Sequence, residues 1–253
     1  MDLLQGKVAI VTGGGRGIGK GIALRFAKEG AKVTLVYHKR RKDAEDTARY
    51  ITQEGGESLV LQADISLKDD VDRFVVKTIE AFGKVDILVN NAGMGGSKAC
   101  LDTLEKDWDR MVAVNLKSIF LVCKRVIPEM IKIGKGKIIN IASLYGMFGS
   151  AHTAAYAASK AGVINFTRQL AVDYASQNIY VNAISPGLIS TEMTQHKVKD
   201  PDALKYFTQP IPLGRPGKPS EVARVALFFA SEESDFVTGQ NLLVDGGQSC
   251  KIM

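Results

Sequence analysis

The chain of 253 residues is 45% apolar and 24% charged, which is typical of one large globular domain and excludes a fibrous or disordered protein. No apolar run reaches the length of about 18 residues that a membrane span requires, and the first residues lack the features of a secretion signal, so we expect a soluble, cytoplasmic protein. The net charge is +6, but outside the cluster at 38–42 the basic residues alternate with acidic ones, so we expect binding neither to nucleic acid nor to membranes. The three cysteines lack metal-ligand spacing, so we expect neither a disulfide nor a bound metal.

Short apolar, β-branched runs alternate with amphipathic stretches along the whole chain. Strands are expected at 8–11, 33–37, 59–62, 87–89, 138–141, 179–184 and 242–244, and helices at roughly 18–29, 41–54, 68–82, 105–132, 154–176 and 219–230. Because parallel strands need long crossovers, this alternation predicts an α/β fold with a doubly wound parallel sheet and helices on both faces. The irregular, proline-rich stretch at 187–218 is too long for a routine connection and is expected to form a lid or binding loop.

A glycine-rich turn follows the first predicted strand, in the pattern Thr-Gly-x-x-x-Gly-x-Gly from Thr12 to Gly19. Glycines there allow a tight turn and let backbone amides approach a pyrophosphate at the N-terminus of the next helix, where the helix dipole favours an anion. The spacing differs from the common G-x-G-x-x-G, because the position three after Gly19 is Ile22. We expect a phosphate cradle, and the alternative is a glycine-rich turn without a ligand.

The residues that follow the second predicted strand are basic. An acid at that place would bind the ribose 2′-hydroxyl of NAD, whereas cations accommodate the 2′-phosphate of NADP. The order here is Tyr37, His38, Lys39, Arg40, Arg41, with no acid until Asp43. We therefore expect NADP(H) to be favoured over NAD(H), with Arg16 and Lys39 or Arg40 at the phosphate. The alternative is a solvated start of a helix.

Tyr156 and Lys160 are four residues apart, so they share one face of a predicted helix, and Ser143 lies thirteen residues before Tyr156. A neighbouring ammonium would lower the pKa of the tyrosine from about 10 and make it a tunable acid or base for a carbonyl oxygen. The alternative is an ordinary surface pair on an amphipathic helix.

Taken together, these motifs resemble the short-chain dehydrogenase/reductase family over essentially the whole chain, and within it the bacterial 3-oxoacyl acyl-carrier-protein reductases. The resemblance rests on residues 12–19, Asp64, residues 90–93, Asn115, Ser143, Tyr156, Lys160, residues 186–187, Thr191, and the segments 212–215, 238–240 and 245–247. It implies a single Rossmann-type catalytic domain over 1–253, of about seven strands, with a substrate lid at about 188–218.

The resemblance also implies an activity and roles for individual residues. The protein would be an NADPH-dependent ketoreductase that interconverts a ketone, such as a 3-oxoacyl thioester of fatty acid biosynthesis, and a secondary alcohol. Tyr156 would be the acid/base, Lys160 would lower its pKa and hold the nicotinamide ribose, Ser143 would orient the carbonyl, and Asn115 would hold a relay water. Alternatives are an alcohol, hydroxysteroid or sugar dehydrogenase and a dinucleotide-sensing protein. Asn115 could also simply cap or kink its helix, and Asp64 could be a turn residue.

The predicted cofactor site has contributions from most of the chain. Its residues are Gly13, Gly15, Arg16, Gly17, Ile18, Gly19, Tyr37, His38, Lys39, Arg40, Asp64, Ile65, Asn91, Ala92, Gly93, Tyr156, Lys160, Pro186, Gly187, Ile189 and Thr191. Asp64 is expected at the adenine, residues 91–93 under the adenosine, and Ile189 with Thr191 at the carboxamide.

The predicted substrate side is mostly apolar, which suits an acyl chain or a hydrophobic ketone. Its residues are Met94, Gly95, Ser143, Leu144, Tyr145, Met147, His152, Leu188, Met193, His196, Tyr206 and Phe207. The two histidines could contact a substrate oxygen or lie at the surface, and the methionine and aromatic side chains could equally belong to the core.

Three positions depart from the resemblance. Gly134 and Gln177 stand where the carrier-protein reductases have arginines that dock an acidic carrier, although Lys132, Lys135 and Lys137 are near; docking of an acyl carrier protein is thus in doubt. Tyr180 stands where many relatives have arginine. The resemblance further implies a homotetramer packed through the fourth and fifth helices and the last strand.

Overall fold

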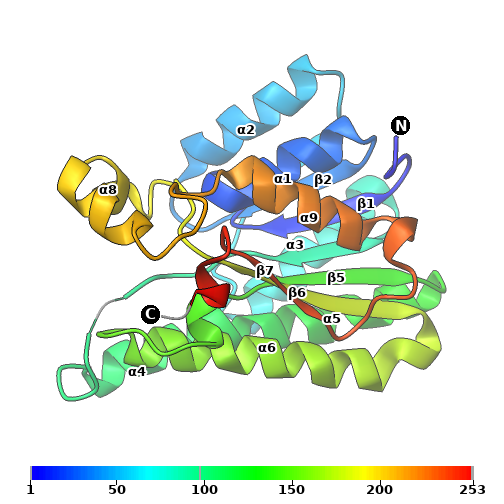
Figure 1. Ribbon diagram of the computed structural model, residues 1–253. Helices are drawn as coiled ribbons and strands as arrows, with labels where there is room; N and C mark the ends of the chain where they lie inside the picture. Colours follow the sequence, from blue (N-terminus) through cyan, green and yellow to red (C-terminus); the bar gives the residue numbers. More distant parts are fainter. Residues whose placement is uncertain (1, 97, 252–253) are drawn as a thin grey trace.

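The apolar runs of the sequence form seven strands of one parallel sheet in a computed structural model that describes residues 2–96 and 98–251 (Figure 1). The strands are β1 (Val8–Thr12), β2 (Lys32–Tyr37), β3 (Ser58–Gln62), β4 (Ile87–Asn90), β5 (Gly136–Ile141), β6 (Ile179–Pro186) and β7 (Asn241–Val244). Their order is β3-β2-β1-β4-β5-β6-β7. The central strands β1, β4 and β5 are buried along their whole length, as parallel strands covered on both faces must be. The expected doubly wound parallel sheet is confirmed.

Helices cover the two faces of the sheet. They are α1 (Gly17–Lys28), α2 (Arg41–Gln53), α3 (Lys68–Phe82), α4 (Glu105–Val112), α5 (Ser118–Lys132), α6 (Ala154–Tyr174), α7 (Gln195–Val198), α8 (Pro201–Thr208) and α9 (Pro219–Ala230). One core cluster joins the sheet to α1 and α9, and a second cluster joins it to α3, α5 and α6. The two clusters lie on opposite faces of the sheet (Figure 1).

The helix predicted at 105–132 is interrupted. A π-helical turn, Ala113–Lys117, separates α4 from α5, and Asn115 lies in this turn. Turns of this kind are rare and often mark functional sites. The predicted bounds of the helical stretch are confirmed, but the π-helical turn within it was not predicted, because sequence periodicity does not register a single inserted residue in a helical turn.

The stretch at 187–218 is closed at its base and contains two short helices, α7 and α8. Ser190 N donates to Gly217 O (2.8 Å), and Gly217 N donates to Leu188 O (2.9 Å). α8 begins with the carboxylate of Asp200 accepting from Ala203 N, and it extends away from the body of the molecule (Figure 1). The expectation of an irregular loop is corrected in this respect.

The far end of this stretch is tied to the segment that follows β7. Leu213 N donates to Gly246 O (3.2 Å), and Lys251 Nζ donates to Gln209 O (2.9 Å). The loop is thus held at both ends, and α7 and α8 lie between the two anchors. As for membranes, the described residues include no helix that is long and apolar enough to cross a bilayer.

Candidate active site

The predicted site residues gather at one edge of the sheet, although the sequence spreads them from residue 13 to residue 193. They follow the carboxyl ends of six strands, β1 to β6, or belong to the helices that come next. β1 and β4 are neighbours, and the chain continues from β1 to β2 on one side and from β4 to β5 on the other. Ligands of open parallel sheets bind at such a switch point.

The glycine turn is fixed by the segment that follows β4. Asn91 Nδ2 donates to Thr12 O (2.8 Å), and the backbone amides of Asn91 and Ala92 both donate to Thr12 Oγ1 (3.0 Å each). A Cβ on Gly19 would overlap the carbonyl oxygen of Gly13 and the side-chain amide of Asn91. Only glycine fits there, so the turn and the predicted floor under the adenosine form one unit.

The first turn of α1 offers free donors to an anion. Arg16 is the N-cap residue and makes no capping hydrogen bond through its side chain, and the first turn contains no acid. The initial amides of a helix lack intrahelical acceptors, and the helix dipole favours negative charge there. Thr191 lies against this turn, since a Cβ on Gly17 would be 3.3 Å from Thr191 Cγ2. The backbone amides of this helix start have no intrahelical acceptors, and the glycine turn has no room for side chains. Both features fit the phosphates of a dinucleotide.

The cations after β2 differ in their partners. Arg41 Nε donates to Glu45 Oε1 (2.6 Å), and Arg40 Nη1 lies 3.9 Å from Asp43 Oδ2. Lys39 has no ion-pair partner within 2–96 and 98–251, and the same holds for Arg16. Of the three candidates for the 2′-phosphate, Arg16 and Lys39 are therefore the cations that no carboxylate of the described residues neutralises.

Asp64 is held by several groups at the end of β3. Its Oδ1 accepts from Ser66 N (3.0 Å) and Ser66 Oγ (2.6 Å), and Arg110 Nη2 donates to Oδ2 (3.1 Å). Burial acts to raise the pKa of this carboxyl, but the hydrogen bonds from Ser66 and Arg110 outweigh it and hold the pKa at about 2. Sequence reasoning found Asp64 but missed Arg110, which comes from α4.

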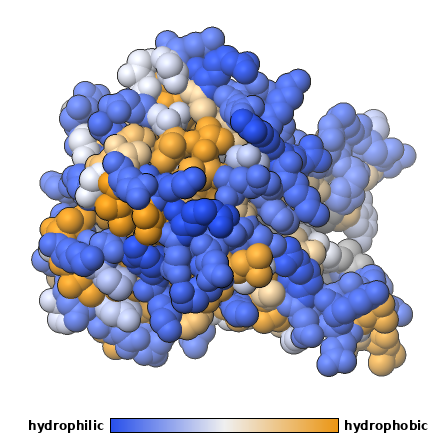
Figure 2. Space-filling view, turned by 180° about the vertical axis from the view of Figure 1, so that it is seen from behind, coloured by the Kyte–Doolittle hydropathy of each residue, from blue (hydrophilic) through white to orange (hydrophobic). Residues whose placement is uncertain are grey.

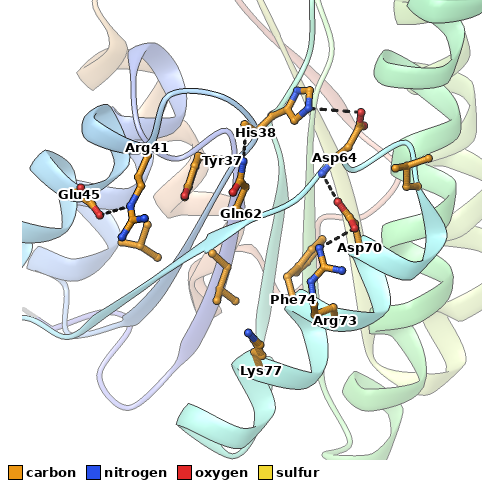
Figure 3. Close-up of a pocket in the computed structure, with 13 residues that line it drawn as sticks. Tyr37, His38, Arg41, Glu45, Gln62, Asp64, Asp70, Arg73, Phe74 and Lys77 are labelled. Carbon is orange, nitrogen blue, oxygen red and sulfur yellow. Dashed lines mark hydrogen bonds and ion pairs between the residues drawn. The ribbon is translucent and has the colours of Figure 1, made fainter.

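Figure 3 shows how His38 and Asp70 approach Asp64 beside β3. His38 Nε2 lies 3.7 Å from Asp64 Oδ2, and Asp64 N donates to Asp70 Oδ2 (2.7 Å). A cavity of about 680 Å³ adjoins these groups, with Tyr37 and Arg41 among its lining residues. The predicted adenine side of the site is thus polar and hollowed.

Tyr156, Lys160 and Ser143 converge between β5 and α6. Lys160 is 5% exposed, its Nζ donates to Ile141 O (2.7 Å), and it lies 6.0 Å from the centroid of the Tyr156 ring. A Cβ on Gly93 would lie 3.7 Å from Lys160 Nζ, so the segment after β4 closes over the ammonium. The alternative of an ordinary surface pair is wrong, because Lys160 is buried.

The pKa values of the pair differ from the expectation. Burial raises the pKa of Tyr156, and hydrogen bonding with Ser143 opposes this rise only in part. Burial lowers the pKa of Lys160 to about 8. The expected lowering of the Tyr156 pKa by Lys160 is not present in this structure, because burial of the phenol dominates its pKa. Tyr156 is therefore protonated near neutral pH.

Asn115 binds the segment after β4 through both ends of its amide. Its Oδ1 accepts from Met94 N (2.8 Å), and its Nδ2 donates to Met94 O (3.0 Å) and to Ser159 Oγ (3.2 Å). Ser159 Oγ in turn donates to Tyr156 O (2.7 Å). Asn115 thus lies at the helix interruption and also connects Met94 to α6. Ser159 was missed by sequence reasoning, although it stands next to Lys160 in the same motif.

The predicted substrate residues lie partly around these groups. A Cβ on Gly95 would be 3.6 Å from Met193 Sδ, so the stretch at 187–218 approaches the segment after β4. Met193 is 51% exposed and Met147 is 45% exposed, which leaves both available to a substrate. His152 is exposed and has the left-handed backbone angle φ of 59°, which is uncommon outside glycine.

The remaining substrate candidates differ in how close they lie to Ser143 and Tyr156. Leu144 is buried, and the carbonyl of Leu188 accepts from Gly217 N at the base of the stretch at 187–218. His196 lies on α7 and is exposed, and Tyr206 packs edge-to-face on Phe207 at 5.2 Å in α8. Tyr145 N donates to Ser143 Oγ (3.2 Å) and so lies next to the catalytic candidates.

Two of the three departures noted in the sequence have structural reasons. Gly134 has φ of 79° in the turn after α5, a conformation that would be strained for arginine. The ring of Tyr180 lies 4.0 Å from Lys137 Nζ, a cation–π contact that leaves this buried lysine next to an aromatic face. No comparable reason is visible for Gln177.

Residues 13–249 match the family model described as Enoyl-(Acyl carrier protein) reductase. Together with the fold and the glycine turn, this match identifies one class of protein. The chain belongs to the short-chain dehydrogenase/reductase family of NAD(P)-dependent oxidoreductases. The resemblance seen in the sequence is confirmed at the level of the family.

Individual relatives refine this assignment. The chain is 42% identical over 257 residues to 3-oxoacyl-(acyl-carrier-protein) reductase FabG of Thermotoga maritima, covering 96% of this chain and 98% of that protein. It is 39% identical over 249 residues to 3beta-hydroxysteroid dehydrogenase 1 of Eggerthella lenta, covering 98% and 95%. Among solved structures it matches levodione reductase with a TM-score of 0.94 and 34% identity, covering 98% of this chain and 100% of that one.

Proposed function

We propose that the protein is an NADPH-dependent ketoreductase that interconverts a hydrophobic ketone or 3-oxoacyl thioester and the secondary alcohol. The observation that carries the proposal is the state of Tyr156, a phenol with a raised pKa that hydrogen-bonds with Ser143 and lies four residues from a buried lysine. A proton donor to a carbonyl oxygen must be protonated at working pH and fixed near the reacting atom. Tyr156 meets the first requirement, and its placement beside Ser143 supports the second.

In the mechanism we propose, the dinucleotide, when bound, supplies the hydride that reduces the carbonyl carbon. The hydroxyl of Tyr156 donates its proton to the carbonyl oxygen as negative charge develops there, and the hydroxyl of Ser143 donates a hydrogen bond to the same oxygen. Lys160, which is buried beside Tyr156 and donates to Ile141 O, would hold the ribose of the nicotinamide half. Oxidation of the alcohol uses the same groups in the opposite direction.

The proton-donor role is tested by Tyr156→Phe. We expect kcat to fall by about 10²- to 10⁴-fold, because a general acid contributes an effect of this size. The Kd for NADPH, measured by fluorescence titration, should change little. A kcat close to that of the wild type would refute the role of Tyr156 as proton donor. Loss of NADPH binding would show that the substitution disturbs the structure of the cofactor site.

NADPH preference rests on Arg16 and Lys39, the two of the three candidate cations for which the described part of the chain supplies no carboxylate partner. In Lys39→Glu we expect the Kd of NADPH to rise by about 10- to 100-fold, as for loss of a charge-assisted hydrogen bond, and the Kd of NADH to change little. Lys28→Glu, with the same charge change at the exposed end of α1, is the control. An equal response of both cofactors to Lys39→Glu would refute the 2′-phosphate contact.

A free hydrophobic ketone is the second candidate substrate, and the ion pairs around Gly134 favour it over a carrier-bound thioester. Lys132 pairs with Glu129 (2.8 Å), and Lys135 and Lys137 both pair with Asp235 (2.6 and 2.8 Å). These three lysines are therefore not free to replace the docking arginines. The hydroxysteroid dehydrogenase relative supports the same alternative.

Initial rates separate the two substrates. NADPH oxidation is measured with acetoacetyl-CoA and with hydrophobic ketones of similar size, and the panel is repeated with NADH. Rates concentrated on the thioester would support a role in fatty acid or polyester precursors. Rates on free ketones alone would place the protein in another branch of the family. They would also support the argument that the ion pairs around Gly134 prevent docking of a carrier protein.

We further propose that residues 1–253 act as one catalytic domain with a lid at about 188–218, and that four copies assemble. Phe120 on α5, Val172 on α6 and Leu242 on β7 are exposed apolar side chains on the elements expected to pack. Figure 2 shows that apolar side chains on one face form several patches separated by polar residues. Light scattering tests the assembly, and the mass of a monomer would refute it.

A further inference from the structure

Arg110 connects two parts of the chain that the sequence separates widely. From α4 it donates through Nη2 to Asp64 Oδ2 (3.1 Å) and through Nη1 to Ser66 Oγ (3.0 Å), 46 and 44 positions earlier. Its planar guanidinium therefore contacts the loop after β3 at two points. Such a two-point contact restricts both the arginine and the loop.

The Asp64 carboxylate has little freedom left. Oδ1 accepts twice from Ser66, Oδ2 accepts from Arg110, and the backbone amide of Asp64 donates to Asp70 Oδ2 (2.7 Å). Figure 3 shows Asp70 and His38 on either side of Asp64, with the imidazole 3.7 Å from Oδ2. Hydrogen bonds from Ser66 and Arg110 outweigh burial and keep the pKa of the carboxyl low, so it stays an acceptor at every working pH.

Stability does not account for this arrangement. The Arg110 side chain is 45% exposed and that of Asp64 18% exposed. An ion pair with so much solvent contact contributes little to folding stability. The precise fixing of one carboxylate at the carboxyl end of β3 is better explained by what the carboxylate binds.

The position of Arg110 in α4 adds a second argument. Five residues further on, the same stretch of helix carries Asn115, whose amide holds Met94 and Ser159. α4 therefore fixes the predicted adenine contact, and the π-helical turn that directly follows it fixes the neighbourhood of Tyr156.

We propose that Arg110 is a positioning residue for the adenine half of the dinucleotide, and that it fixes the Asp64 carboxylate to accept a hydrogen bond from the exocyclic amino group of adenine. This inference rests on the proposed function, in which Asp64 is the adenine contact. Arg110 acts on both NADPH and NADH, since both contain adenine, and it has no part in hydride or proton transfer.

The test compares Arg110→Met with Arg110→Lys and uses both halves of the cofactor as probes. Calorimetric titration of the purified full chain with AMP, NADPH and NADH should give Kd values about 3- to 10-fold higher for Arg110→Met, as for the loss of one fixed hydrogen bond. Reduced nicotinamide mononucleotide, which lacks adenine, should support the same rate as in the wild type. Arg110→Lys should recover part of the loss, because lysine keeps the charge but not the two-point contact.

Arg49→Met is the matched control, because it removes an exposed arginine that pairs with Asp46 on α2 (3.1 Å). It should leave all four ligands unaffected. In an Asp64→Asn background, Arg110→Met should add no further loss of AMP affinity.

Three results would overturn the inference. Unchanged AMP affinity in Arg110→Met would remove the role, and a parallel fall in the rate with the mononucleotide would show a general structural effect. An undiminished loss in the Asp64→Asn background would show that Arg110 does not act through Asp64. Failure of the wild type to bind NADPH at all would instead refute the proposed function.

Discussion

Replacement of Lys160 by methionine should change how folding stability depends on pH. Lys160 is buried, and burial lowers its pKa from 10.5 to about 8. In Lys160→Met the apolar stem keeps a similar length, and the charge and the hydrogen bond to Ile141 O are removed. We expect activity to be lost and the pH dependence of unfolding to change in a defined direction.

The sign follows from the protons bound in each state. Between about pH 8 and 10.5 the unfolded lysine is charged while the folded one has lost its proton, so the free energy of unfolding of the wild type rises with pH in this window. Above 10.5 both states are neutral, and below about 8 both are charged and the folded state bears the full desolvation. The shift corresponds to roughly 3 kcal/mol.

The size of this pH effect is measured as the difference in the free energy of unfolding between the wild type and Lys160→Met. The free energy of unfolding of the wild type minus that of Lys160→Met should rise by about 2 to 3 kcal/mol from pH 7 to pH 10, since other titrating groups cancel. The lost hydrogen bond to Ile141 O adds a term of about 1 to 3 kcal/mol that does not vary with pH.

Urea denaturation followed by circular dichroism at several pH values measures this difference. Lys28→Met, at an exposed position near the end of α1, should give a difference that does not vary with pH. A flat difference for Lys160→Met as well would refute the reasoning, because it would mean that Lys160 is not desolvated in the folded protein.

Two further predictions concern a glycine and the thiols. Gly19→Ala places a Cβ against the carbonyl oxygen of Gly13, so we expect a loss of stability of about 1 to 3 kcal/mol and weaker NADPH binding, whereas Gly149→Ala, with open space around it, should melt like the wild type. Burial raises the pKa of Cys123 to about 12, so a thiol reagent should modify only the two exposed cysteines of the native protein and reach Cys123 after unfolding. Equal melting of the two glycine variants, or rapid modification of all three thiols, would contradict these predictions.

The sequence predicted most of the fold because local patterns determine it. β-branched runs gave the strands, since a buried parallel strand reads as a continuous apolar segment. The spacing of Tyr156 and Lys160 placed them on one helix face, and the glycines placed the turn after β1. Each of these signals lies within a few consecutive residues.

The missed features depend on contacts between distant segments. The interruption between α4 and α5 includes Asn115, which binds Met94 21 residues earlier, and Arg110 reaches Asp64 across 46 residues. Burial of the phenol between segments far apart in the sequence raises the pKa of Tyr156, where the sequence had predicted a lowered one. No periodicity within a window of ten to twenty residues contains such information.

The anchoring of the lid by the segment after β7 has a consequence for changing substrate range. Gly246 accepts from Leu213, a Cβ on Gly246 would meet Ile211 at 2.7 Å, and Lys251 holds Gln209. Substitutions at 246–251 therefore alter how the stretch at 187–218 is held. Directed evolution for new ketones thus has a second set of positions to vary besides those around Tyr156, and this set acts on the proposed lid from behind.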